Sequence, residues 1–518
     1  MERFVARYRP SITAVLSGFD RLVFRGTLLG LVMQGGMYTF LTRAQVRLLD
    51  FKAYVLATSE RVKAAALREA VEQDRPIRYL ESSATDKEAL ARRLLAEHPV
   101  DEGLICVLKT LEPCMSFEYH RAPDPQDRGL RLRPRKCLHI YKYYRHRVFG
   151  FMSARLQTWF PFAIQFCLNG REWLAQQLQR QGRADFRRHD NSFTWLGDPA
   201  RAQRLMARQL ALAWPRALNA LARQLNPVHA AIFKPWPQTY YWSIYQSEWA
   251  TDLLFKDSRA LAAVYPALVR HATLHFQSPD VMRFLERKLP PYFTGELVSR
   301  VTARPEGVRV KHWVNGNSIK MYDKGGSILR VETTIAKTRD FKVLRPLQHT
   351  PHGPLAWRPL RKGVADLHRR AQLSQRANEH YLDALAAVDD STPLHGLLDQ
   401  VSRPTVYRGR RVRACRIGDP ADLALLQAIS RGEWAPAGFR NRDLRRLLYP
   451  SPRPASPSET RRLAAKVTRQ LRLLRAHGLI HKISKTHRYR LTPKGQLLTA
   501  ALFAARDATL KQLIGTAA

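Results

Sequence analysis

The sequence has 518 residues, enough for about three domains. Hydrophobic residues make up 45% of it, so a sizeable core is possible and a fully disordered chain is excluded. The 86 Lys and Arg residues outnumber the 43 Asp and Glu residues, which gives a formal net charge of +43. Such a surplus repels itself unless a polyanion screens it, so the composition favours nucleic acid as the partner, with an anionic membrane surface as the competitor.

Targeting signals and cysteine chemistry point to the cytoplasm. No run of 18 apolar residues occurs, and the longest candidate, residues 28–41, is interrupted by polar and glycine residues. The basic N-terminus is not followed by the apolar segment of a signal peptide. The five cysteines are widely spaced and form no CxxC pair, which argues against a disulfide scaffold and a zinc finger. We therefore expect a cytoplasmic protein without a membrane partner.

Residues 1–130 are expected to form an N-terminal α/β domain, and the sequence does not indicate its role. Ala-, Leu- and Arg-rich runs predict helices, and apolar or alternating runs predict strands. The expected elements are helices at 44–72 and 86–97 and strands at 76–80, 103–111 and 115–120.

A central domain, residues 131–390, is predicted to begin with a basic and aromatic stretch. A loop is expected at 122–136 and a strand at 137–144. Cations hold phosphates and aromatic faces stack bases, so this stretch predicts a surface for single-stranded nucleic acid. The alternative is that its tyrosines are half-buried sheet residues beside a solvated basic edge. The residues expected to bind nucleic acid are Lys136, Tyr141, Lys142, Tyr143 and Arg145.

Further along this domain, the hydrophobic period changes to two. Over 308–314, three valines and a histidine alternate with two cations and a tryptophan. Asn315-Gly316 predicts a hairpin turn, and strands are expected at 318–322 and 328–335. Gly325-Gly326 predicts the second turn. The pattern therefore predicts a β-meander.

Candidate chemistry lies in and before this meander. Glu248 and Asp252 are four residues apart and share a face in either a helix or a strand. Carboxylates can bind a divalent cation, a tyrosine hydroxyl can attack phosphorus, and cationic side chains can neutralise the developing charge. Tyr322 is the tyrosine that the spacing favours, and Tyr240, Tyr241 and Tyr245 are the alternatives. The alternative is a structural meander with surface ion pairs.

The sequence of this region resembles that of the replication initiators of rolling-circle plasmids and filamentous phages. The resemblance rests on Lys320, Tyr322, Asp323, Lys324, Arg330 and Glu332, with Glu248 and Asp252 upstream. It implies single-strand nicking through a covalent phosphotyrosine, dependent on Mg²⁺ or Mn²⁺. The implied catalytic residues are Tyr322, Lys320, Lys324 and Arg330, and the implied metal ligands are Glu248, Asp252 and Glu332.

A linker at 391–417 and a C-terminal unit at 418–518 complete the predicted organisation. From residue 401 onward, 25 Lys and Arg face 6 Asp and Glu, a net charge of +19. Helices are expected at 421–430, 441–448 and 458–477, followed by two short strands and a closing helix. The order of these elements, with Gly478-Leu479-Ile480 and Tyr489-Arg490-Leu491, resembles winged-helix DNA-binding domains.

That resemblance implies a recognition helix in the major groove and a wing on the DNA backbone. The implied recognition residues are Arg461, Arg462, Lys466 and Arg469, and those of the wing are Lys482, Lys485 and Arg488. We therefore expect a multi-domain α/β (α+β) protein that acts as a DNA-binding replication or transposition initiator of a mobile element. A non-enzymatic transcriptional regulator and an RNA-binding protein are the alternatives.

Overall fold

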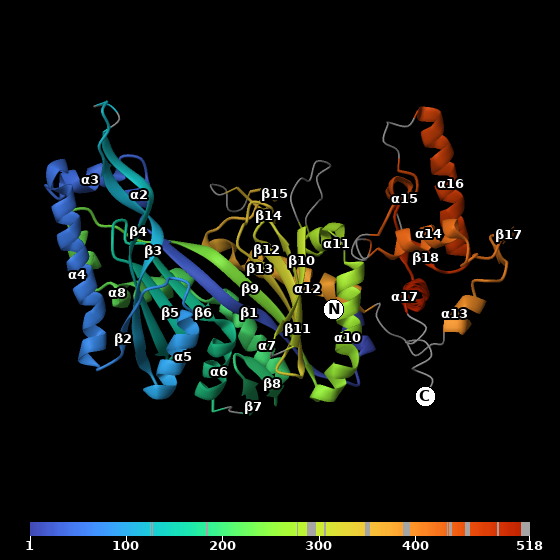
Figure 1. The fold of residues 1–518 in the computed structure, drawn as a ribbon, viewed down its shortest axis with the longest axis horizontal. Helices are drawn as coiled ribbons and strands as arrows, with labels where there is room; N and C mark the ends of the chain where they lie inside the picture. The colour runs from blue at the N-terminus through green and yellow to red at the C-terminus, as the bar shows by residue number, and fades with distance from the viewer. Residues whose placement is uncertain are drawn as a thin grey trace. The chain divides into compact units, whose positions relative to one another are not determined.

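The protein has a mixed α/β fold, as predicted. The computed structural model describes residues 1–124, 126, 128–182, 185–276, 278–286, 297–304, 307–347, 353–386, 394–431, 434, 438–450, 456–483 and 486–508. Figure 1 shows the arrangement of the helices and strands.

The helices have the following bounds: α1 Glu2–Arg7, α2 Leu29–Val32, α3 Gly36–Arg43, α4 Phe51–Glu72, α5 Lys87–Glu97, α6 Gly170–Arg180, α7 Pro199–Arg208, α8 Trp214–Leu225, α9 His229–Ile232, α10 Ser258–His275, α11 Ser278–Phe284, α12 Leu367–Leu385, α13 Leu394–Asp399, α14 Pro420–Ser430, α15 Asn441–Leu448, α16 Pro457–Ala476 and α17 Pro493–Asp507. The strands have the following bounds: β1 Ile12–Thr27, β2 Ile77–Leu80, β3 Gly103–His120, β4 Gly129–His146, β5 Gly150–Gln157, β6 Ile164–Asn169, β7 Phe186–His189, β8 Ser192–Leu196, β9 Tyr241–Phe255, β10 Leu297–Arg304, β11 Gly307–Val314, β12 Asn317–Lys324, β13 Ile328–Ile335, β14 Lys342–Arg345, β15 Ala356–Pro359, β16 Thr405–Tyr407, β17 Arg410–Val412, β18 Ile480–Lys482 and β19 Tyr489–Leu491.

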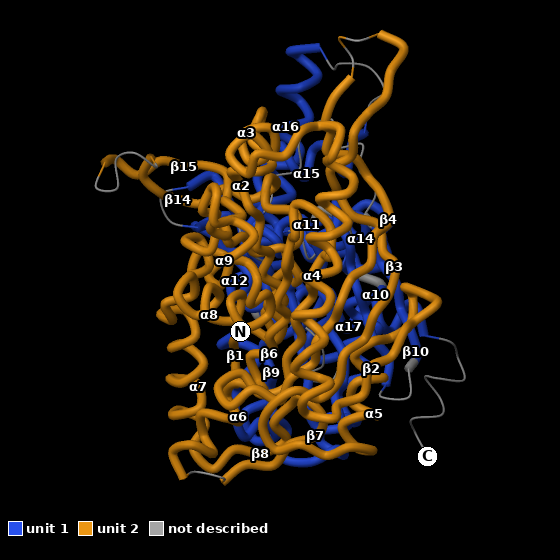
Figure 2. The backbone as a smooth tube through the Cα atoms, turned by 90° about the vertical axis from the view of Figure 1, so that its left-hand side faces the viewer, with its two compact units in different colours: residues 1–15, 251–333, 373–518 blue, residues 16–250, 334–372 orange. Residues whose placement is uncertain are grey.

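Within the described residues, the largest sheet has 11 strands in the order β10-β11-β12-β13-β9-β1-β6-β5-β4-β3-β2. The chain divides into two compact units, coloured in Figure 2. Unit 1 contains residues 1–15, 251–333 and 373–518, and unit 2 contains residues 16–250 and 334–372.

In unit 2, strands β3 and β4 form a long antiparallel hairpin that pairs as far as His120 and Gly129. The loop predicted at 122–136 is therefore wrong over its second half, which belongs to β4. Glu118 on β3 forms an ion pair of 2.6 Å with Arg135 on β4, which adds a side-chain contact between the two strands. The predicted domain boundary after residue 130 falls inside β4.

In unit 1, the predicted β-meander is confirmed. Strands β11, β12 and β13 are successive neighbours, and β10 pairs with the outer edge of β11. Asn315 and Gly316 have φ values of 49° and 80°, the left-handed pair of a tight hairpin turn. The turn before β13 is fixed by the Gly326 amide, which donates to Asp323 Oδ1 at 2.9 Å.

The end of unit 1 has its own core, which α14, α15, α16, α17 and strand β18 share. Leu397, Val401 and Cys415 are buried in this same core, although they lie in the segment predicted as a linker. That segment forms α13 and the hairpin β16–β17 where the structure describes it. Its apolar residues are too few and too spread out to show a periodic pattern in the sequence.

Among the helices that the structure describes, none combines the length and apolar character needed to cross a membrane.

Candidate nucleic-acid interface

Helix α16 (red in Figure 1) spans Pro457–Ala476, within one residue at each end of the predicted 458–477. The Ser456 hydroxyl accepts from the Glu459 amide at 3.2 Å, Pro457 occupies the first turn, and Glu459 places an acid at the positive end of the helix dipole. Gly478, with a φ of 70°, allows the chain to leave the helix. The caps therefore fix a helix of 20 residues.

Opposite faces of α16 have opposite chemistry. Val467, Leu471 and Leu474 are buried in the core at helical spacing. The four predicted recognition residues are all exposed: Arg461, Arg462, Lys466 and Arg469. The apolar face orients the helix, so its cations are directed to solvent as the sequence predicted.

Helix α15 holds α16 through specific polar contacts. The Asn441 side-chain amide donates to the Ala464 carbonyl at 2.9 Å and to Thr468 Oγ1 at 3.0 Å. The Lys466 ammonium lies 4.7 Å from the centre of the Tyr449 ring, at the end of α15. These contacts fix the turn of α16 that carries the exposed cations.

A small hairpin, β18–β19, follows α16. The Phe439 and Tyr489 backbones exchange two hydrogen bonds of 2.8 Å, which add a third short extended segment to the hairpin. Gly438 is required beside this bridge, because a Cβ there would lie 2.4 Å from the Tyr489 carbonyl oxygen. Lys482 is exposed on the hairpin, and half-buried Arg488 donates to the Gly438 carbonyl at 3.3 Å. Lys485, the third predicted wing residue, lies outside the described residues.

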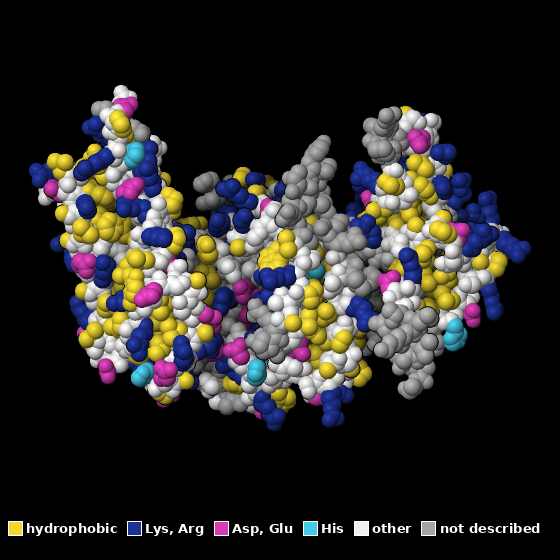
Figure 3. Space-filling view, viewed as in Figure 1, with side chains coloured by type: hydrophobic (Ala, Val, Ile, Leu, Met, Phe, Trp, Pro, Cys, Tyr) yellow, Lys and Arg dark blue, Asp and Glu magenta, His cyan; other side chains and the backbone are white. Residues whose placement is uncertain are grey.

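The charge on α16 is not compensated. In the described part of the chain, no carboxylate lies within 4.0 Å of the cationic atoms of Arg461, Arg462, Lys466 or Arg469. Figure 3 shows Lys and Arg side chains gathered at the edge of the molecule that α16 and β17 occupy in Figure 1. An exposed row of free guanidinium and ammonium groups is available for phosphate oxygens.

The basic and aromatic stretch on β4 is arranged differently. The Lys142 side chain is 1% exposed, and its ammonium lies 2.8 Å from Glu69 on α4. Tyr143 is buried in an apolar cluster with Ile105, Leu108 and neighbouring residues. The prediction that Lys142 and Tyr143 contact nucleic acid is therefore corrected, because both side chains are packed inside unit 2.

Three other predicted residues of β4 reach the surface to different extents. The Tyr141 hydroxyl donates to both oxygens of Glu112, at 2.9 and 2.7 Å, and burial, the first of several causes, raises the pKa of Tyr141. Lys136 is exposed, and half-exposed Arg145 lies 3.8 Å from Asp101. The role predicted for Lys136 and Arg145 stays a prediction.

The candidate catalytic residues of unit 1 meet at the Glu332 carboxylate. Tyr322 donates its hydroxyl to Glu332 Oε2 at 3.1 Å, and the Lys320 ammonium lies 2.7 Å from Glu332 Oε1. Burial opposes ionisation of Glu332. The charges of Lys320 and Arg330, with hydrogen bonds from Lys320 and Tyr322, nevertheless lower the pKa of Glu332. The spacing on β12 and β13 thus brought three predicted residues together. Lys324, another of the predicted catalytic residues, is half-buried at the end of β12.

Asp252 and Arg330 form a separate buried pair. The guanidinium Nε and Nη2 of Arg330 donate to the two oxygens of Asp252 at 2.5 and 2.8 Å, and the two side chains are 0% and 1% exposed. Asp252 is thereby neutralised and Arg330 is already engaged. The predictions of a metal ligand at Asp252 and a phosphate-binding cation at Arg330 are corrected. Asp252 is paired with Arg330, and Glu332 is paired with Lys320. The expected binding of Mg²⁺ or Mn²⁺ stays a prediction.

Glu248, the remaining predicted metal ligand, lies on β9 in unit 2. Its Oε1 accepts from Gln246 at 2.7 Å, and its carboxylate lies within 4.8 Å of that of Asp20. Asp20 was not predicted as a site residue. It is an isolated acid in the mostly apolar sequence of β1, and its neighbours become known only from the pairing of the strands. The nearby Cys167 and these carboxylates raise the pKa of Arg21.

Strands β3 and β4 also bring together side chains that the cysteine spacing did not connect. The ligand atoms of Cys114, Cys137 and His139 lie within 4.8 Å of one another. The Nδ1 atom of His139 contacts the Cys137 carbonyl at 3.1 Å. Burial, followed by the charge of Arg155, lowers the pKa of His139 to about 4.

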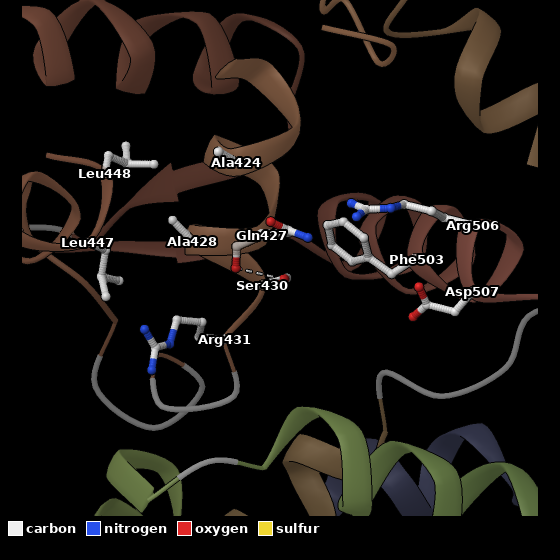
Figure 4. Close-up of a pocket in the computed structure, with 10 residues that line it drawn as sticks. All are labelled: Ala424, Gln427, Ala428, Ser430, Arg431, Leu447, Leu448, Phe503, Arg506 and Asp507. Carbon is white, nitrogen blue, oxygen red and sulfur yellow. Dashed lines mark hydrogen bonds between the residues drawn. The ribbon is translucent and has the colours of Figure 1, made fainter. Parts of the chain in front are cut away.

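A hollow of about 520 Å³ lies between α14, α15 and α17 (Figure 4). Ala428, Leu447, Leu448 and Phe503 supply apolar walls, with Arg431 among the polar residues around them. Helix α16 contributes no residue to this hollow, so it is separate from the exposed cations described above.

Comparison of the chain with protein-family models, with curated proteins and with solved structures finds no match.

Proposed function

We propose that this protein binds duplex DNA through the exposed cationic face of α16, with the hairpin β18–β19 against the sugar-phosphate backbone. The observation that carries the proposal is the exposed row of Arg461, Arg462, Lys466 and Arg469, which the described carboxylates leave unpaired. Arginine suits both phosphate and the guanine edge, because its planar donors bind two acceptors at once.

The shape of α16 supports duplex DNA over RNA. A helix fits the major groove of B-DNA, whereas the corresponding groove of an RNA duplex is too narrow for it. The apolar face of α16 is fixed by the core and the Asn441 contacts, so the cations are presented from a rigid element. The proposal therefore retains winged-helix-like DNA recognition, and with it the alternative of a transcriptional regulator.

The test is fluorescence anisotropy of labelled duplex DNA, titrated with the full chain at several salt concentrations. Arg461→Ala with Arg469→Ala removes two exposed cations from α16. We expect an affinity loss of about 100-fold and a salt slope smaller by about 2, since each lost phosphate contact contributes about 0.9 to the slope.

The matched control is Arg259→Ala with Arg270→Ala, which removes two exposed arginines from α10. An equal loss in both double variants would show that net charge alone determines binding. Tighter binding of structured RNA than of duplex DNA at one salt concentration would favour the RNA-binding alternative.

A second candidate function, single-strand nicking by a mobile-element initiator, is supported by the Tyr322–Glu332 contact. At 3.1 Å the Glu332 carboxylate is within reach of the tyrosine proton, as a general base must be. In the proposed step, Tyr322 Oη bonds to phosphorus and its proton passes to Glu332. The P–O3′ bond breaks, and the leaving oxygen takes a proton from the Lys320 ammonium.

A plasmid-nicking assay tests this second function, with the products denatured to detect DNA covalently attached to protein. Tyr322→Phe should abolish attachment, because it removes the hydroxyl beside Glu332. Tyr245→Phe should retain it, because Tyr245 is exposed on β9 and its hydroxyl donates to no described carboxylate. The absence of nicked product from the unmodified chain, with and without Mg²⁺ or Mn²⁺, would leave DNA binding as the function.

A further inference from the structure

An arginine-lined pocket lies beside the C-terminal half of α16. Its volume is about 340 Å³, and its cationic residues come from two elements: Arg408 and Arg410 from the hairpin β16–β17, and Arg472 and Arg475 from α16. Tyr407, Thr468, Leu471 and Tyr489 complete the lining. No carboxylate is among these residues, so the pocket is a concentrated positive site.

The four arginines are available to a ligand. Within the described ranges, none of them forms an ion pair with Asp or Glu. The Arg408 and Arg475 guanidinium groups instead lie 5.7 and 5.5 Å from the centre of the Tyr407 ring. These weak contacts position the guanidinium groups and leave their donors free for an anion.

The hairpin that completes the pocket is anchored. Arg408 and Gly409 have φ values of 53° and 73°, which make a tight two-residue turn between β16 and β17. The Cys415 amide donates to the Val401 carbonyl at 2.9 Å, and both residues are buried in the C-terminal core. The two ends of the segment are therefore tied together, and its tip is presented beside α16.

We infer that this pocket binds a phosphate group of the DNA backbone, and that the hairpin β16–β17 is a clamp beside the duplex held by α16. Arg461, Thr468, Arg472 and Arg475 follow one face of α16, so the pocket lies on the same face as the recognition residue Arg461. Arg461 and Arg475 are separated by about 21 Å along the helix. Tyrosine and threonine hydroxyls add neutral donors of the kind that bind phosphate oxygens.

This inference rests on the proposed DNA binding, and its test separates the two. Arg408→Ala with Arg410→Ala removes the hairpin side of the pocket. The matched control is Arg403→Ala with Arg411→Ala, which removes two exposed arginines of the same segment that do not line the pocket. Circular dichroism melting confirms that both double variants fold.

In anisotropy titrations with labelled duplex DNA, we expect the pocket variant to bind about tenfold more weakly, with a salt slope reduced by about 1 to 2. The control variant should stay within about twofold of the unmodified chain. Equal binding by the two double variants, with the α16 variant still impaired, would overturn the clamp and leave the proposed function standing. Absence of duplex binding by the unmodified chain would overturn the proposed function itself.

Isothermal titration with inorganic phosphate separates a backbone phosphate from a small anionic ligand. Saturable phosphate binding that disappears in the pocket variant, together with unchanged duplex affinity, would assign the pocket to a small ligand and overturn the clamp.

Discussion

Strand β4 and helix α16 are both rich in Arg and Lys, yet their cationic side chains have different environments. On β4, Lys142 is paired with Glu69 inside unit 2, and Tyr141 donates to Glu112. On α16, Arg461 and Arg469 are exposed, and no described carboxylate pairs with them.

The difference shows that the basic and aromatic composition of a segment does not by itself identify a nucleic-acid surface. Glu69 and Glu112 lie far from the tyrosines of β4 in sequence, and the fold brings them to that strand. The α16 helix itself contains only Glu459, at the first turn, and within the described ranges no acid from another element pairs with its exposed cations. We expect substitutions on β4 to change stability and substitutions on α16 to change binding.

The largest effect is expected for Glu69→Gln. Lys142 would remain 1% exposed without a counter-charge, and the Tyr144 hydroxyl would lose its 3.0 Å contact with the carboxylate. Breaking a buried pair in this way costs about 3 kcal/mol of unfolding free energy, which urea denaturation measures. Glu60→Gln, on the exposed side of α4, is the control. Reduced DNA affinity with unchanged stability would contradict the assignment.

The second prediction concerns pH and His139. Burial is the largest cause that lowers the pKa of His139 to about 4, and the charges of Arg155 and Lys87 act in the same direction. The charge of Glu112 opposes them. Between about pH 6.5 and 4 the unfolded chain binds a proton that the folded chain excludes, so stability falls as the pH falls through this window. The loss should reach about 2 kcal/mol in urea denaturation across that range.

His139→Gln should flatten this pH dependence, while the exposed His481→Gln should leave it unchanged. The same slope in the unmodified chain and the His139 variant would assign the acid sensitivity to other groups.

A smaller effect is expected for Tyr141→Phe. The substitution removes hydrogen bonds of 2.9 and 2.7 Å to Glu112, which keeps its contacts with Lys87 and Arg155. We expect a loss of about 1 kcal/mol in unfolding free energy and no change in affinity for single-stranded or duplex DNA. Weaker binding of single strands without a change in stability would support the predicted stacking role of Tyr141.

Local patterns in the sequence predicted the elements that depend on local physics. The caps and the apolar spacing of α16, and the glycine turns of the meander, are set within a few residues of each element. Long-range pairing was not predictable in the same way. Lys142 reads as a surface cation, and only the packing of α4 against the sheet places Glu69 beside it.

The candidate catalytic residues show the same limit. The two-residue period placed Lys320 and Tyr322 on one face, and the paired strands brought Glu332 to them. Asp252 and Arg330 were predicted as site residues, but nothing in the sequence indicates that they form a buried ion pair with each other. The arginine-lined pocket was missed because its two halves, on the hairpin and on α16, are about 60 residues apart in sequence.

The smallest stability effect is expected for Lys466→Ala on α16. The substitution removes the ammonium that lies 4.7 Å from the centre of the half-buried Tyr449 ring, a loss of about 0.5 kcal/mol in unfolding free energy. Duplex affinity should nevertheless fall several-fold, and the salt slope should fall by about 0.9, because a phosphate contact is removed. Lys466→Arg keeps the charge and should retain both properties. If Lys466→Ala instead destabilised the protein as much as Glu69→Gln and left affinity intact, Lys466 would be a structural residue, as Lys142 of β4 is.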